Sequence, residues 1–178
     1  MNDLDYARRS LLCLELSDLP DDETRVAIKA RLAFQIRIHQ ILHDNPRICE
    51  FGCNTIERNP DRTDARQPYV PKTHDKFKID DRQTERLRKM CAFINETMPL
   101  GDNPHGRKLI GSYGFKHVLE KQNWTEDTNR YVSNGEGILA MMLCGYKPRW
   151  SKDNENPNCV FSVTKIPYLR LVREAERR

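Results

Sequence analysis

The amino-acid sequence predicts a mainly α-helical, irregular protein with a long extended connector and at most one short β element near the C-terminus. Three observations support this fold class. Apolar residues recur every three or four positions through several long segments, which is the period of one helix face. Residues 58–79 lack that period. Only residues 159–163, with the sequence Cys-Val-Phe-Ser-Val, have the β-branched and aromatic composition of a short strand.

The N-terminal region, residues 1–57, is predicted to contain three helices. The first covers residues 3–16, where leucine and alanine side chains fall at helical spacing. The second covers residues 21–43 and begins with acidic residues, which the dipole of a helix N-terminus favours. Pro46 is placed to open a short third helix over residues 47–57, because proline suits the first turn of a helix.

Residues 58–79 are predicted to form an extended connector. Apart from prolines, the only apolar residue between Asn59 and Pro68 is Ala65, so this stretch has no side chain that anchors it to a core. A loop of about twenty residues is uncommon inside a compact domain. We therefore expect the connector to separate the N-terminal region from a C-terminal domain, residues 80–178.

The C-terminal domain is predicted to be built from helices. Asp80 or Asp81 caps a helix whose apolar residues recur as far as Met98. A second helix covers residues 112–122, and the last begins near Pro167.

A third helix of this domain, residues 133–145, is expected to be its buried centre. Ser133 and Glu136 have the spacing of a capping box, in which each side chain binds the backbone of the other residue. The helix that follows is apolar on every side, which is typical of a helix surrounded by protein.

Composition and charge restrict the class of protein. The 30 basic and 26 acidic residues give a net charge of +4, and 38% of the 178 residues are hydrophobic. No apolar run approaches the length of a membrane-spanning helix, and the acidic N-terminus lacks the basic and apolar regions of a secretory signal. We therefore expect a protein of the cytoplasm or nucleus that is not secreted and does not bind a membrane. Its cysteines are expected to stay reduced.

Two histidines and two cysteines are spaced as the ligands of a structural zinc site. His39 and His43 lie one helical turn apart, and Cys49 and Cys53 would do the same if residues 47–57 were helical. A short turn between two antiparallel helices would then bring the four side chains together. Two imidazoles and two thiolates complete a tetrahedral zinc site with no open position, which indicates a structural role. The alternative is two surface histidines beside two ordinary cysteines.

Basic and aromatic residues are interleaved in two segments of the C-terminal domain, residues 104–122 and 147–152. Lysine and arginine neutralise phosphates, and aromatic rings stack on unpaired bases. The residues predicted to contact nucleic acid are Arg107, Lys108, Lys116, Lys121, Lys147, Arg149, Trp150 and Lys152. Alternatively, the aromatic side chains complete the core and the charges are ordinary solvated surface.

The sequence contains no recognised catalytic motif. The phosphate-binding, nucleophile-elbow and zinc-protease patterns G-x-x-x-x-G-K-[ST], G-x-G-x-x-G, G-x-S-x-G and H-E-x-x-H do not occur. One alternative left open is a metal-dependent nuclease that uses Asp80, Asp81, Glu85 and His105. The carboxylates fit a helix N-terminus better, and we therefore expect a protein that is not an enzyme.

The function predicted from these patterns is non-enzymatic binding of DNA or RNA through a basic and aromatic surface, with zinc as a stabilising ion. The alternative is a protein-interaction module, either a subunit or an inhibitor of a larger complex. It would dock through residues 58–79 and the charged C-terminal tail, because a polar segment without core anchors can wrap the surface of a partner.

Overall fold

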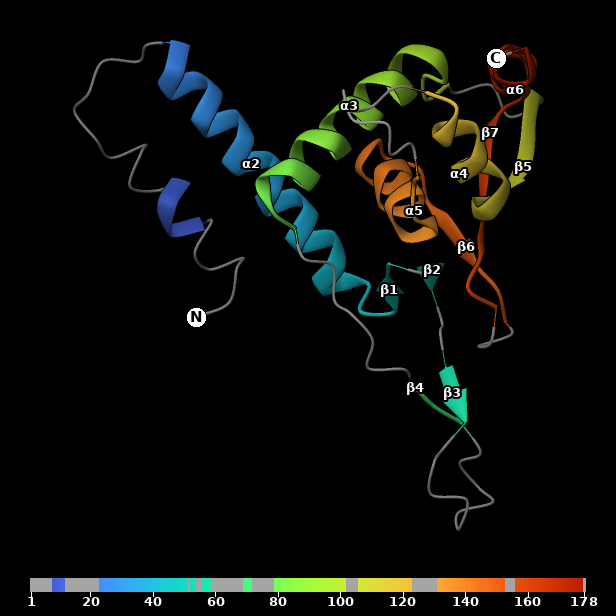
Figure 1. Cartoon of the computed structure of the whole chain (residues 1–178), viewed down its shortest axis with the longest axis horizontal. Helices are drawn as coiled ribbons and strands as arrows, with labels where there is room; N and C mark the ends of the chain where they lie inside the picture. The colour runs from blue at the N-terminus through green and yellow to red at the C-terminus, as the bar shows by residue number, and fades with distance from the viewer. Residues whose placement is uncertain are drawn as a thin grey trace.

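The fold is known from a computed structural model, which describes residues 8–11, 23–50, 52–53, 56–58, 69–71, 79–101, 106–122, 131–152 and 156–177. Helices dominate these residues, and Figure 1 shows helix α5 (Asn134–Leu143) between the long helices on one side and a small sheet on the other. The mainly α-helical prediction is confirmed at this level. The limit of one short β element was wrong, because the described residues contain seven strands in three small antiparallel sheets.

Helix α2 (Glu23–Asp44) confirms the second predicted helix. Its Ile38 is fully buried, and Phe34, Ile41 and Leu42 pack against the same core from the apolar face of the helix. Within the predicted first helix, residues 8–11 are helical, and the remainder lies outside the described residues.

Residues 47–57 do not form the predicted third helix. Strands β1 (Ile48–Cys49) and β2 (Gly52–Cys53) form a small antiparallel hairpin instead. Gly52 has a φ of +132°, and a Cβ atom at this position would lie 2.1 Å from the carbonyl oxygen of Pro157. Only glycine tolerates this backbone conformation and this close approach, so the chain reverses here where a helix would continue.

Part of the predicted connector is paired. Strand β3 (Ile56–Arg58) runs antiparallel to β4 (Tyr69–Pro71), with Glu57 opposite Val70. Residues 59–68 and 72–78 of the predicted connector lie outside the described residues.

Helix α3 (Asp81–Thr97) begins as the sequence predicts. The carboxylate of Asp80 accepts a hydrogen bond from the backbone N–H of Gln83 at 2.7 Å, which satisfies a donor that the first helical turn leaves open. The side chains that this helix buries are Thr84, Leu87, Met90, Cys91 and Ile94.

Helix α5 confirms the predicted capping box and the predicted buried centre. The Ser133 hydroxyl accepts a hydrogen bond from the backbone N–H of Glu136 at 3.1 Å. The Glu136 carboxylate accepts one in return from the backbone N–H of Ser133 at 2.8 Å. Nine of the ten residues of α5 are buried, because α2, α3, α4 and the β1–β2 hairpin all pack against it.

The largest sheet has the strand order β5-β7-β6, formed by β5 (Arg107–Gly111), β6 (Pro148–Trp150) and β7 (Cys159–Thr164). The central strand β7 confirms the predicted strand, whereas β5 and β6 were not predicted. Alternate residues of β7 point to opposite faces. The buried face carries Cys159, Phe161 and Val163, and the outer face carries Val160, Ser162 and Thr164.

Helices α4 (Ser112–Glu120) and α6 (Lys165–Glu176) confirm the predicted helices that follow β5 and β7. The residues on both sides of 58–79 share one hydrophobic core, because Ile38, Ile48 and Cys53 are buried together with the side chains of α3, α5 and β7. Within the ranges given above, no helix combines the length and the apolar character needed to cross a bilayer.

Candidate functional site

The residues predicted to contact nucleic acid occupy the two outer strands of the sheet and their neighbours. Strand β5 runs directly into α4, and we call residues 107–121 the β5–α4 segment. The exposed basic residues of this segment are Arg107, Lys108 and Lys121. The second group follows α5 along and around strand β6 and consists of Lys147, Arg149, Trp150 and Lys152.

The β5–α4 segment presents its basic side chains in two ways. The guanidinium of Arg107 donates a hydrogen bond to the carbonyl oxygen of Gly101 at 3.0 Å. The ammonium of Lys108 lies 5.4 Å from the centre of the Tyr168 ring, within the range of a cation–π contact. Neither partner is acidic, so the positive charge of both side chains is not neutralised by these contacts.

Lys116 corrects the sequence prediction. Its side chain is buried, with 6% of the residue exposed, whereas the prediction placed it on the phosphate-binding surface. The ammonium donates to Glu120 at 2.8 Å and to the carbonyl oxygen of Val132 at 3.1 Å. A buried lysine is tolerated only when its charge is paired and hydrogen-bonded, and these two acceptors meet that requirement.

Glu120 is the only acidic residue of the β5–α4 segment, and its carboxylate is fully engaged. It accepts hydrogen bonds from Lys116, from His117 Nδ1 at 2.6 Å and from the backbone N–H of Val132 at 3.2 Å. Burial raises its pKa, but these hydrogen bonds outweigh burial and hold the pKa of Glu120 below its usual 4.5. Lys116 and Glu120 therefore cancel, and the exposed basic residues leave the segment positive.

The residues around β6 divide between surface and core. Lys147, Arg149 and Lys152 are exposed. Trp150 packs partly against the core, and the guanidinium carbon of Arg47 lies 5.8 Å from the centre of its ring. The alternative prediction, that the aromatic residues complete the core, therefore describes Trp150 better than a stacking role does.

The outer face of the sheet connects the two basic groups. In the register of the sheet Arg107 lies opposite Thr164 and Arg149 lies opposite Val160, so both arginines share the outer face with these residues of β7. Strands β5 and β6 flank β7, which places them roughly 10 Å apart across the sheet. The outer face therefore carries one arginine on each of its two edges.

The predicted zinc ligands are not brought together. His43 is exposed and faces Asp44 at 3.2 Å, whereas Cys53 is buried and donates to the carbonyl oxygen of Pro157 at 3.4 Å. Cys49 and Cys53 lie on the β1–β2 hairpin and not on one helix face. Among the residues whose placement is described, no three His, Cys, Asp or Glu side chains form a group that could hold a metal ion.

Burial, partly offset by the charge of Arg47, raises the pKa of the Cys53 thiol to about 11. Zinc at His39, His43, Cys49 and Cys53 remains a prediction, which elemental analysis of the purified protein tests.

The carboxylates of the nuclease alternative have structural partners. Asp80 caps α3, Asp81 forms an ion pair with Arg31 of α2, and Glu85 pairs with Arg88 at 2.8 Å. His105 lies outside the described residues.

Sequence reasoning missed a thiol pair between α3 and the end of α5. The Cys91 thiol donates to the carbonyl oxygen of Ala140 at 3.7 Å, and the Cys144 thiol donates to the carbonyl oxygen of Cys91 at 3.6 Å. Hydrogen bonding with Cys91 and burial both raise the pKa of Cys144. The two residues are 53 positions apart, so no local spacing signals their contact.

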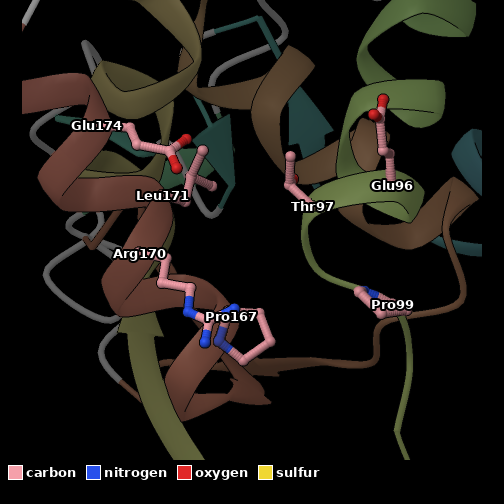
Figure 2. A pocket seen from close by; sticks show the side chains of 7 residues that line it. All are labelled: Glu96, Thr97, Pro99, Pro167, Arg170, Leu171 and Glu174. Carbon is pink, nitrogen blue, oxygen red and sulfur yellow. The ribbon is translucent and has the colours of Figure 1, made fainter.

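A cavity of about 300 Å³ lies between the end of α3 and helix α6 (Figure 2). Its lining residues are Glu96, Thr97, Pro99, Pro167, Arg170, Leu171 and Glu174. Carboxylates from both helices and one guanidinium surround this space, and none of the predicted site residues contributes to it.

Comparisons with known proteins give no relative. No family model, no curated protein and no solved structure matches this chain.

Proposed function

We propose that this protein binds nucleic acid without catalysing a reaction, through phosphate contacts from the β5–α4 segment and the residues around β6. One observation carries the proposal. The three strands β5, β6 and β7 contain no acidic residue, and the two basic residues on the outer face of their sheet, Arg107 and Arg149, are both exposed. A sheet surface of one charge sign attracts a polyanion.

The neighbouring residues strengthen this positive surface. Lys121 directly follows α4 as its C-terminal cap, and Lys147 and Lys152 flank β6. All three side chains are exposed. Glu120 is already paired with Lys116 and does not offset these charges. Each lysine or arginine that contacts a phosphate releases condensed counterions, so affinity is expected to fall steeply as salt increases.

The test is charge reversal at an exposed residue that has no part in the core. We expect Lys121→Glu to weaken binding to every nucleic-acid sequence and to reduce the slope of log K against log salt by about 1. The matched control is Lys89→Glu on α3, which is also exposed and changes the net charge by the same amount. Fluorescence anisotropy with DNA and RNA oligonucleotides at several salt concentrations measures both effects.

Two results would contradict the proposal. One is the absence of binding to any oligonucleotide at low salt, and the other is an equal loss of affinity in the Lys121→Glu and Lys89→Glu variants. Either result would favour the alternative, a protein-interaction module that docks through residues 58–79 and the charged C-terminal tail. Lys116 is unsuitable for this test, because reversing the charge of a buried lysine next to Glu120 would unfold the helix contact itself.

A further inference from the structure

Three aromatic rings are grouped at the surface of α4. Tyr113 and His117 lie one turn apart on this helix, with their ring centres 4.8 Å apart and their planes perpendicular. Tyr131 joins them from the segment that leads into α5. Tyr113 is 54% exposed and Tyr131 is 55% exposed, although aromatic side chains of this size are usually buried. We call Tyr113, His117 and Tyr131 the aromatic platform.

Buried Lys116 holds the two tyrosines of this platform in place. Its ammonium lies 5.5 Å from the centre of the Tyr113 ring and 4.6 Å from the centre of the Tyr131 ring. The same ammonium is anchored by Glu120 and by the carbonyl oxygen of Val132. Both rings are therefore positioned before any ligand arrives, which lowers the entropy lost on binding.

Tyr146 and Tyr168 have a structural explanation. Tyr146 is 5% exposed and its hydroxyl donates to the carbonyl oxygen of Met98. Tyr168 packs partly against the core and lies beneath Lys108. Tyr113 and Tyr131 are instead more than half exposed, so a ligand can reach their rings.

We propose that the aromatic platform stacks on unpaired bases, so that the nucleic acid this protein binds is single-stranded. This inference rests on the proposed function. Base–aromatic stacking needs an open base face, which a duplex covers with the neighbouring base pairs. Lys121 follows Tyr113 and His117 on the same side of α4 at four-residue intervals, about 6 Å of helix rise each, and supplies a phosphate contact beside the rings.

Arg107 and Lys108 precede Tyr113 in the same strand-to-helix segment, so the chain that leads into the platform carries two further exposed basic residues. The ammonium of Lys116 is shared between the rings and Glu120, so the platform already contains its cation. The ligand therefore needs no cation of its own at the rings, and it binds through the neutral faces of its bases and through its phosphates.

The experiment compares a labelled oligodeoxythymidine of about 16 nucleotides with the duplex formed by adding its complement. Thymidine runs have little structure of their own, so their bases are open. We expect the wild-type protein to bind the single strand more tightly than the duplex in fluorescence anisotropy. Tyr113→Leu and Tyr131→Leu should each weaken binding to the single strand by about 5- to 150-fold, which is the effect of losing one base–aromatic stack.

The conservative variants Tyr113→Phe and Tyr131→Phe are the matched controls, because they keep the ring and lose the hydroxyl. They should bind the single strand like the wild type. Circular dichroism shows whether each leucine variant keeps its fold. Ultraviolet crosslinking of the wild-type protein to the same oligodeoxythymidine needs no variant, and mass spectrometry should place the crosslinks at Tyr113 or Tyr131.

The outcomes separate this inference from the proposed function. Equal affinity for single strand and duplex, folded leucine variants that bind like the wild type, or crosslinks confined to other residues would each overturn the aromatic platform while leaving phosphate binding intact. A wild-type protein that binds neither oligonucleotide at low salt would overturn both proposals.

Discussion

At the scale of single residues, Lys116 shows how tertiary packing changes the role of a charged side chain. Its position between Phe115 and His117 on a helix that ends in charged residues predicts a solvated ammonium. In the fold, residues 131–132 lie over this side of α4, and the ammonium reaches Val132 and Glu120. Removing a lysine from water is unfavourable, and the ion pair and backbone hydrogen bond offset that cost.

The Glu120 carboxylate makes stability depend on acid pH. Its hydrogen bonds hold the pKa in the folded state below the usual 4.5, despite burial. Such a group stabilises the folded state above the unfolded pKa, and the stabilisation is lost as the pH falls through the folded value. Urea denaturation at a series of pH values below about 4.5 should show a shallower loss of stability in Glu120→Gln than in the wild type.

A suitable control for this prediction is Glu96→Gln, since Glu96 is an exposed glutamate on α3. Both variants remove one carboxylate, so the comparison isolates the hydrogen bonds that Glu120 accepts. If Glu120→Gln instead lost stability on acidification as steeply as the wild type, the network around Lys116 would not be the source of the effect.

At the scale of elements, the sequence predicts helices better than strands, because a helix carries its signal within one segment. The spacing of apolar residues located α2, α3, α4 and α6, and the capping box located the start of α5. Strand β5 was missed because Ile110 is its only buried side chain, so no alternation is visible. Its partner β7 lies about fifty residues further along the chain, beyond any local pattern.

The candidate site follows the same division. The basic and aromatic pattern of residues 107–121 was visible in the sequence, and the exposed Arg107, Lys108 and Lys121 agree with it. Tyr131 was not visible as part of this group, since its contact with Lys116 depends on how the segment before α5 packs on α4. The predicted zinc site required a helix at residues 47–57. The positive φ of Gly52 is incompatible with a helix there.

Two glycines in different elements should respond oppositely to alanine. Gly52→Ala places a Cβ atom 2.1 Å from the Pro157 carbonyl oxygen, at a φ of +132°. We therefore expect this substitution to lower the free energy of unfolding by about 1–3 kcal/mol or more. At Gly114, in helix α4, an added Cβ atom would meet no atom within 4 Å. Gly114→Ala should therefore raise the free energy of unfolding by about 0.5–1 kcal/mol, because alanine favours a helix more than glycine does. Chemical denaturation of both variants measures these changes, and changes of the same sign would contradict this account of Gly52.

At the scale of the whole molecule, the shared core links the two regions that flank residues 58–79. Arg47 lies over the Trp150 ring, and Ile38 and Ile48 are buried with the residues of α5. Regions that share a core unfold together. We expect a single transition in which the fluorescence of Trp150, isolated by Trp124→Phe, coincides with loss of the helical signal in circular dichroism. Two separate transitions would support independent domains on either side of residues 58–79.

The strand order β5-β7-β6 has a consequence for the synthesis of the protein on the ribosome. The central strand is the last of the three to be made, so when Arg107–Gly111 and Pro148–Trp150 emerge from the ribosome their pairing partner does not yet exist. Helices α2, α3 and α4 can begin to pack on α5 earlier, because all four helices precede β7 in the chain. Until Cys159–Thr164 is translated, the nascent chain holds two unpaired strand edges, which makes this the stage at which chaperones have most to protect.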